Sequence, residues 1–188
     1  MDLPSLIHAL GPDLPSTVHS ELAAAWTPRF VEKGRMLVRQ GEAVTNEVML
    51  LDGKIVSMIS DGEGRAVCVG FCKGPGIVAP HISRTREGIS LVTLEVTADA
   101  TIAEMHADTL LAMMLRSPDI RDWANGILRM ELSRKTDREW CLAALGGADR
   151  LGWFRDRYPD YEASFAHSHI ASFLAMTAVS FSRLRNST

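Results

Sequence analysis

The chain has 188 residues, of which 46% are hydrophobic and 23% charged, and its formal net charge is −3. A chain of this size and apolar content can bury a core, which excludes a disordered protein and predicts one or two domains. Because no apolar run approaches the roughly 18 residues that span a bilayer, and the first residues do not resemble a secretory signal, we expect a cytoplasmic protein that does not enter a membrane.

The first part of the chain predicts mainly β structure. A short helix is expected in STVHSELAAAWTP (16–28), opened by a Ser or Thr cap and ended by proline. Short apolar segments follow, separated by glycine-rich turns about 8–12 residues apart, which is typical of a β-sandwich or barrel. Asp52-Gly53 predicts a tight hairpin between the strands 48–51 and 55–59, because glycine accepts the positive φ that such a turn requires.

Three cysteines are too few and too scattered to form a disulfide framework. Cys68 and Cys72 lie four residues apart in a predicted strand, so we expect them to share one face as core thiols. An iron–sulfur cluster normally has four such ligands, so we expect neither a bound metal nor a cofactor.

After Met105 the apolar spacing changes to that of helices. A short helix is expected in 106–118 and a long one in 118–145, with Pro118 in its first turn, where proline is best tolerated. An apolar stripe on the long helix packs either on the chain's own barrel or on a second copy, and we favour the dimer because the stripe is narrow and the helix long. The stripe consists of Ile120, Trp123, Ile127 and Met130.

Gly146-Gly147 ends the long helix and predicts a hinge, because glycine adopts backbone angles closed to other residues. A shorter helix should follow in 149–158. The sequence therefore divides into a β domain with flanking helices (1–117), a long helix (118–145) and a terminal helical domain (146–188).

The segment SHIASFLAMTAVSFSRLR (168–185) predicts two short helices joined by a tight turn. Thr177 is placed to cap the second helix by accepting a backbone N–H. The apolar positions expected inside are Ile170, Phe173, Leu174, Val179, Phe181 and Leu184. The outward positions expected on the second helix are Ala178, Ser180, Ser182, Arg183 and Asn186, where hydroxyls can reach phosphates and arginine can bond a guanine edge.

The order of these parts resembles the Crp/Fnr (cyclic-AMP receptor protein/FNR) family of bacterial transcription regulators over nearly the whole chain. The resemblance is carried by FVEKGRMLVRQGEAV and EVMLLDGKIVSMIS, which resemble the opening of that family's β-roll. It is also carried by DREWCLAALGGADRLGWFRDRYPDY, similar to the long-helix end, hinge and first DNA-domain helix, and by HIASFLAMTAVSFSRLR, similar to its helix-turn-helix.

The resemblance implies an α+β fold with a cyclic-nucleotide-binding-type β-roll (jelly roll), a long dimerisation helix and a C-terminal helix-turn-helix domain. It implies a homodimeric regulator of double-stranded DNA, with RNA polymerase and an unidentified small-molecule effector as further partners. The candidate DNA contacts are His169, Thr177, Ala178, Ser180, Ser182, Arg183 and Arg185.

The sensor departs from the nucleotide-binding members of the family at two places. Val78-Ala79 stand where those members carry Gly-Glu, and Ser90-Leu91-Val92 where they carry Arg-Ser/Thr-Ala. A buried phosphate without that arginine loses its strongest hydrogen bonds, so we expect the sensor not to bind cyclic AMP. His81, Arg84 and Arg86 are candidate ligands for another anion, the alternative being a solvated loop.

The second helix of the predicted helix-turn-helix, and the turn before it, also depart from the family pattern. Ala175 stands at the turn glycine of the family pattern and Val179 where many members have a base-reading glutamate, whereas Arg183 matches the family's arginine. Little or no wing is expected after the second helix. Two functions stay open: a DNA reader that relies partly on DNA shape, or a sensor or interaction protein that retains the fold without binding DNA.

We do not expect an enzyme. The H-x-H pair His167 and His169 lies outside the β region, in which His81 stands alone, so no metal site of the barrel type is indicated. No nucleophile motif or phosphate-binding glycine loop occurs, and GKIVS has the wrong spacing for one.

Overall fold

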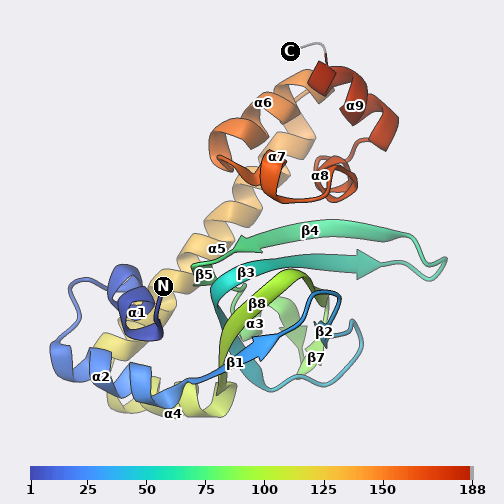
Figure 1. Cartoon of the computed structure of the whole chain (residues 1–188). Helices are drawn as coiled ribbons and strands as arrows, with labels where there is room; N and C mark the ends of the chain where they lie inside the picture. The colour runs from blue at the N-terminus through green and yellow to red at the C-terminus, as the bar shows by residue number, and fades with distance from the viewer. Residues whose placement is uncertain (187–188) are drawn as a thin grey trace.

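The computed structural model describes residues 1–186 as a lower lobe, built from the sheet and several helices, and an upper helical lobe, joined by one long helix (Figure 1). This is the expected α+β architecture. The helices are α1 Leu3–Leu10, α2 Ser16–Ala25, α3 His81–Arg84, α4 Ala107–Arg116, α5 Pro118–Ala144, α6 Gly147–Arg157, α7 Tyr161–Ser164, α8 His167–Phe173 and α9 Ala178–Asn186. The strands are β1 Thr27–Val31, β2 Met36–Val38, β3 Asn46–Ser60, β4 Ala66–Lys73, β5 Gly76–Ile77, β6 Thr85–Arg86, β7 Ile89–Ser90 and β8 Thr93–His106.

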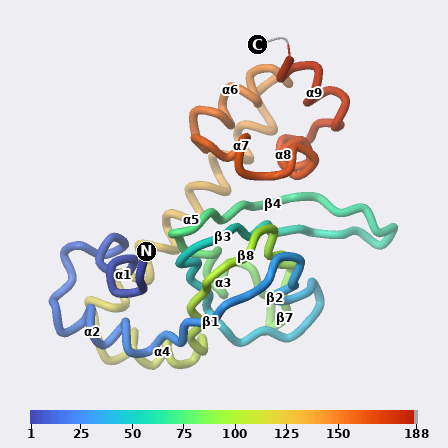
Figure 2. Tube along the Cα trace, viewed as in Figure 1, coloured from blue at the N-terminus to red at the C-terminus, as the bar shows by residue number. Residues whose placement is uncertain are grey.

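The main sheet is antiparallel in the order β1-β8-β3-β4, with β2 added to β8 and β5 to β3, and β6 pairs separately with β7. Figure 2 shows β3 and β4 as a long hairpin that extends beneath the upper lobe. The turn of this hairpin lies at 61–65, where the Asp61 amide donates to the Arg65 carbonyl (3.1 Å).

The hairpin predicted at Asp52-Gly53 is wrong. β3 runs through both residues without turning, although its register against β8 shifts beside Asp52. Gly53 does have a positive φ of 103°, and a Cβ there would lie 2.6 Å from the backbone oxygen of Asp99. The glycine therefore permits a close approach between two long strands rather than a reversal of the chain.

One core of the lower lobe lies between the sheet and α1, α2, α4 and the first turns of α5, and a second, the sheet core, lies among the strands themselves. Ile120, Trp123 and Ile127 are buried in the former, so three members of the predicted stripe pack on their own chain, as in the first of the two interpretations. Met130 differs, because 46% of its surface is exposed. α1 had not been predicted, and α2 begins without the expected side-chain cap, after Pro15.

The α5–α6 junction shows no sign of the backbone freedom that the hinge prediction assumed. Gly146 has a φ of −76°, which any residue can adopt. The Arg150 guanidinium donates to the carbonyls of Leu142 (2.8 Å), Leu145 (2.9 Å) and Leu174 (3.1 Å), so it ties the end of α5 to the end of α8. Both ends have carbonyls without helical partners, which explains why an arginine is stabilising there.

The upper lobe shares its hydrophobic core with the lower one. Val56 of β3 and Cys68 of β4 are fully buried against side chains of α6 and α8. The ring of Phe71 on β4 contacts those of Phe165 (4.8 Å between centroids) and Phe173 (5.1 Å). A strand of the lower lobe therefore completes the core of the helical domain.

The cysteines are free and buried or half-buried, but Cys68 and Cys72 do not share a face. The register of β4 against β3 shifts between Cys68 and Gly70, which adds one residue and reverses the alternation of side chains. Cys68 thus packs with the upper lobe and Cys72 with the sheet core. Burial raises the pKa of both thiols to about 12, so both stay protonated at neutral pH.

Among residues 1–186, no helix combines the length and the apolar character needed to cross a membrane.

Candidate nucleic-acid interface and ligand cavity

α8, a tight turn and α9 form a helix-turn-helix, as predicted. The Met176 amide donates to the Ala171 carbonyl (2.8 Å) and the Ala175 amide to the Ser172 carbonyl (3.1 Å), which is the Schellman pattern of a helix end. Ala175 has the left-handed φ of 54° that this pattern requires and that glycine adopts more easily. The turn glycine of the family pattern is therefore replaced without loss of the turn itself.

Thr177 caps α9, as the sequence predicts. Its Oγ1 accepts a hydrogen bond from the Ser180 amide (3.1 Å) and donates one to the Ser180 hydroxyl (2.9 Å). Both hydroxyls are exposed, and they hold the start of α9 in place.

One face of α9 is open to solvent. Phe181 is buried and Leu184 half-buried, as predicted, but Val179 is 61% exposed, so its assignment to the packed face is wrong. Helical spacing places Val179 beside Arg183 rather than beside Phe181, because steps of four residues stay on one side of a helix. The open face consists of Ala178, Val179, Ser182, Arg183 and Asn186.

The other candidate DNA contacts lie away from that face. His169 is half-buried on α8, and its Nδ1 is buried without a hydrogen-bond partner in residues 1–186. Nη1 of Arg185 lies 3.0 Å from Nδ1 of His167, so Arg185 is directed back toward the start of α8. Arg183 makes no ion pair within residues 1–186, which leaves its guanidinium available to a ligand.

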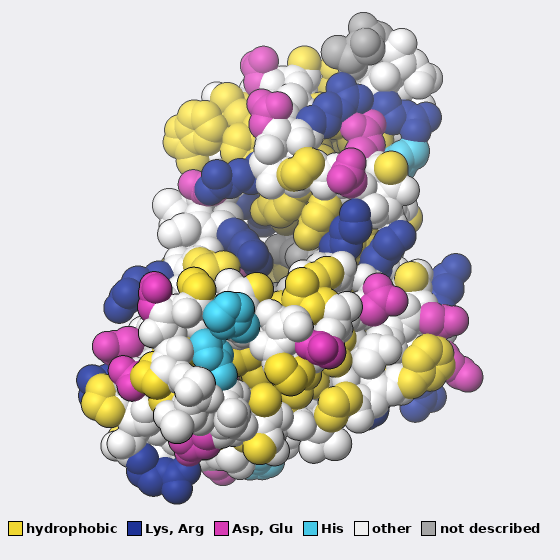
Figure 3. All heavy atoms as spheres, turned by 60° about the vertical axis from the view of Figure 1, so that its left-hand side comes forward, with side chains coloured by type: hydrophobic (Ala, Val, Ile, Leu, Met, Phe, Trp, Pro, Cys, Tyr) yellow, Lys and Arg dark blue, Asp and Glu magenta, His cyan; other side chains and the backbone are white. Residues whose placement is uncertain are grey.

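Basic side chains occur on the upper lobe both near its top and where it meets the lower lobe (Figure 3). Some of them are neutralised. Arg155 forms an ion pair with Glu162 (2.7 Å), and its hydrogen bond lowers the pKa of that carboxyl below the ordinary value of 4.5. Arg157 pairs with Asp137 of α5.

A cavity of about 660 Å³ lies between the sheet and α5. Val78, Ala79, Leu91 and Val92 line it. These are four of the five positions that the family resemblance assigns to nucleotide binding; the fifth, Ser90, is buried outside the lining and donates its hydroxyl to the Val92 carbonyl (2.7 Å). The wall that they form is apolar, with no carboxylate or guanidinium at any of the four.

The three candidate anion ligands, His81, Arg84 and Arg86, differ in their position relative to the cavity. Arg84 lines the cavity, but its guanidinium donates to the backbone carbonyls of Ala79 (2.9 Å) and Asn46 (2.6 Å). The His81 ring nitrogen Nε2 lies 2.8 Å from the Val44 carbonyl oxygen, and Arg86 is exposed outside the cavity lining. The structure therefore brings Arg84 alone of the three to the cavity wall.

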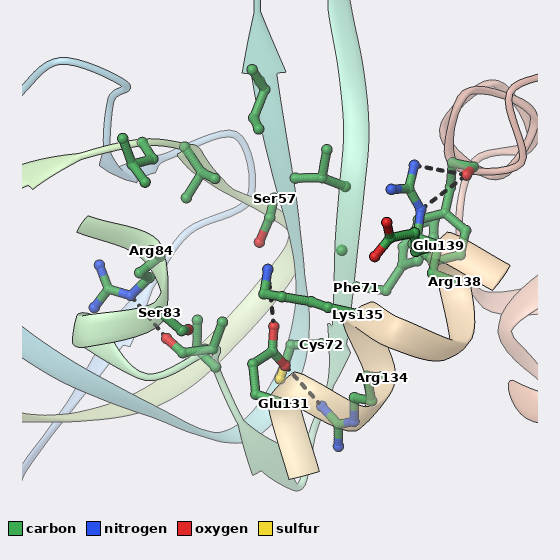
Figure 4. A pocket seen from close by; sticks show the side chains of 18 of the residues that line it. Ser57, Phe71, Cys72, Ser83, Arg84, Glu131, Arg134, Lys135, Arg138 and Glu139 are labelled. Atoms are coloured by element: carbon green, nitrogen blue, oxygen red, sulfur yellow. Dashed lines mark hydrogen bonds and ion pairs between the residues drawn. The ribbon is translucent and has the colours of Figure 1, made fainter. Parts of the chain in front are cut away.

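The charged wall of the cavity belongs to α5 and was missed by sequence reasoning. Its members are Glu131, Arg134, Lys135, Arg138 and Glu139 (Figure 4). Glu131 pairs with Lys135 (3.3 Å) and Arg134 (3.8 Å), whereas Arg138 reaches the upper lobe. The run of charges in ELSRKTDRE, spaced three and four residues apart, was the signal that could have pointed to this face.

No protein-family model and no curated protein matches the sequence, whereas many solved structures match the fold. FixK2 from Bradyrhizobium japonicum is 15% identical, with a TM-score of 0.73 over 86% of this chain and 83% of FixK2. A crp/fnr-family transcriptional regulator from Eubacterium rectale is 16% identical, with a TM-score of 0.72 over 96% and 86% of the two chains. CLP, a c-di-GMP-responsive global regulator from Xanthomonas campestris, is 15% identical, with a TM-score of 0.71 over 92% and 91%. The β-roll, the long helix and the helix-turn-helix, together with these structures, show that the chain has the fold of the Crp/Fnr transcription regulators.

Proposed function

We propose that this protein is a homodimeric transcriptional regulator that reads the major groove of DNA through α9. The observation that carries the proposal is the open face of α9, which presents small side chains and the Arg183 guanidinium, without an ion pair in residues 1–186, from a capped, well-packed helix-turn-helix. Small side chains let a helix approach the base edges closely, and arginine bonds guanine with two hydrogen bonds.

The dimer forms along the second half of α5. Met130, Ser133, Asp137, Trp140 and Ala144 share one side of this helix at steps of three and four residues. Trp140 is 55% exposed, which is unusual for so large an apolar side chain on a chain without a partner. Two copies joined there would present two α9 helices to successive major grooves, about one DNA turn apart.

The cavity is the effector site of the sensor. Its sheet side is apolar, and its α5 side has three cations against two carboxylates, so it suits an apolar ligand with an anionic group. Cyclic AMP fits poorly, because the cavity lacks the arginine and carboxylate that hold its phosphate and ribose in the nucleotide-binding relatives. The output is a change in transcription by RNA polymerase at the bound site.

Selection of bound sequences from a random pool of duplex DNA tests the proposal. We expect an enriched sequence with two half-sites, and an affinity that falls steeply with salt, since contacts to phosphates release counterions. Arg183→Ala should weaken binding to that sequence by roughly 1–3 kcal/mol and relax one position of each half-site. Arg35→Ala, at an exposed arginine of the sensor, should leave both properties unchanged.

The second candidate function is a sensor or interaction protein that does not read DNA. It is favoured by Val179, which places an exposed apolar side chain on the face that would meet the bases. A pool that shows no enrichment, together with a weak affinity equal for all sequences, would refute the DNA-reading proposal and support this second function.

A further inference from the structure

Arg138 of α5 is joined to the last residue of α8. Its Nε and Nη2 donate to the Phe173 carbonyl oxygen at 3.1 and 2.9 Å, and its Cζ lies 4.5 Å from the centroid of the Phe173 ring. A carbonyl at the end of a helix has no partner within the helix, so these charge-assisted bonds fix the point at which the turn into α9 begins. The ring contact adds a cation–π attraction.

α8 is also held by the sensor strand β4. The Cys68 amide donates to the Ser172 hydroxyl (3.0 Å), and the Phe71 ring lies against that of Phe173. α8 in turn supports α9 through the buried side chain of Phe181. The direction in which α9 faces therefore depends on the contacts that α8 makes with α5 and β4, together with the packing of α6 on α9.

The same residues form one end of the cavity. Arg138, Phe173, Phe71 and Tyr158 all line it, and Figure 4 shows Arg138 at the end of the cavity next to the upper lobe. Among the cations of the α5 wall, Arg134 and Lys135 are paired with Glu131, whereas Arg138 forms no ion pair within residues 1–186 and donates to a neutral carbonyl. An anion attracts a guanidinium more strongly than a carbonyl does, so Arg138 is the cation whose partner an anionic ligand would replace.

We propose that Arg138 is the positioning residue of the helix-turn-helix, and that an anionic ligand in the cavity draws its guanidinium away from the Phe173 carbonyl. The end of α8 then loosens, and the specific affinity of α9 for DNA falls. The inference rests on the proposed function, because it assigns the link between the sensor cavity and the DNA-reading helix.

The first test uses the full chain without DNA. Hydrogen exchange is followed by mass spectrometry in peptides covering 170–180, with anilinonaphthalene sulfonate as the probe, because it joins an apolar aromatic body to an anionic group. Arg138→Gln is compared with Arg134→Gln, which removes a cation of the same wall that is paired with Glu131 and forms no hydrogen bond with α8 in the part of the chain that the structure describes. We expect faster exchange in 170–180 for Arg138→Gln but not for Arg134→Gln.

The probe should have the same effect on the natural chain as the substitution. It should accelerate exchange in 170–180 of the natural chain and add nothing in Arg138→Gln. Equal acceleration in both proteins, or no binding of the probe to the natural chain, would overturn the role of the cavity. Unchanged exchange in Arg138→Gln would overturn the role of Arg138.

The second test measures the ratio of specific to non-specific DNA affinity on a selected site. Hydrogen bonds to charged groups are strong enough for Arg138→Gln to lower this ratio by about tenfold, while its affinity for random duplex stays the same. Arg138→Lys keeps the charge and should restore part of the ratio. It also replaces Arg138→Gln as the test variant should the latter fail to fold. A merely structural role would lower both affinities together with the melting temperature and so would contradict the inference.

The two tests separate the inference from the proposed function. If the natural chain binds DNA specifically but Arg138→Gln keeps the full ratio, the inference fails and the proposed function stands. If the exchange results are as expected but the natural chain selects no sequence, the link between cavity and turn stands and DNA reading fails.

Discussion

At the scale of the single residue, Ala175 shows how the turn of the helix-turn-helix tolerates a departure from glycine. Its φ of 54° is left-handed, and an alanine there has a strain of about 1–2 kcal/mol. Glycine removes the strain but loses more backbone entropy on folding, which offsets part of the gain. We therefore expect Ala175→Gly to raise the free energy of unfolding by about 0.5–1 kcal/mol, measured by urea denaturation. Ala112→Gly, on the exposed side of α4, should instead lower it by about 1 kcal/mol, and a similar loss at Ala175 would contradict the assigned turn.

Glu162 gives a pH dependence with a definite sign. The hydrogen bond and charge of Arg155 lower its pKa in the folded state below the ordinary value of 4.5. Its contribution to stability is therefore complete above that value and is lost as the pH falls through the lowered pKa. Glu162→Gln should lower the melting temperature at pH 7, with a stability loss of about 1 kcal/mol or less, and the difference should shrink as the pH falls below 4.5. Glu32→Gln, at an exposed carboxylate without an ion pair in residues 1–186, is the control, and a difference that grows toward acid would contradict the assignment.

At the scale of the element, local signals predicted the helices better than the strands. α5 follows from Pro118 at its start, and α9 from Thr177 as its cap, because these signals act within one turn of the chain. The hairpin prediction at Asp52-Gly53 was wrong because a glycine with positive φ occurs both in tight turns and where two paired strands approach closely. Only the pairing with β8 distinguishes the two cases. The face of Cys72 was misjudged for a similar reason, since the shift in β4 is set by its pairing with β3.

The candidate site was predictable on α9, the helix proposed to read DNA, and not at the cavity. Arg183 lies on the open face of α9, as its spacing from Phe181 and Leu184 indicates. The contact between Arg138 and the Phe173 carbonyl joins residues 35 positions apart, and no periodicity of either helix encodes it. Such contacts depend on how two elements dock, which a pattern in one element does not specify.

The outer side of α5 gives a prediction at this same scale. Trp140 and Leu111 are exposed to similar extents, 55% and 53%, but Leu111 lies on α4, and only Trp140 belongs to the proposed seam. A buried tryptophan is often an energetic centre of an interface, so Trp140→Ala should weaken dimerisation by about 2 kcal/mol or more, roughly 30-fold in the dissociation constant. Sedimentation velocity at micromolar concentration measures this, with Leu111→Ala as the matched control. A natural chain that stays monomeric, or equal effects of the two substitutions, would refute the seam.

At the scale of the whole molecule, the two lobes should behave as one cooperative unit because β4, a strand of the lower lobe, completes the core of the helical domain. Phe71 lies among the rings of Phe154, Phe165 and Phe173 but is only half-buried, so Phe71→Ala should lower the free energy of unfolding by about 2–3 kcal/mol, somewhat less than a fully buried phenylalanine. Hydrogen exchange should accelerate in α6 and α8 as much as in β4, although the substitution lies in the sensor. Phe30→Ala, at a phenylalanine that is 63% exposed on β1, should change neither quantity. If exchange accelerates in the sheet and stays unchanged in α8, the lobes are independent, and a signal in the sensor cannot reach α9 through their shared core.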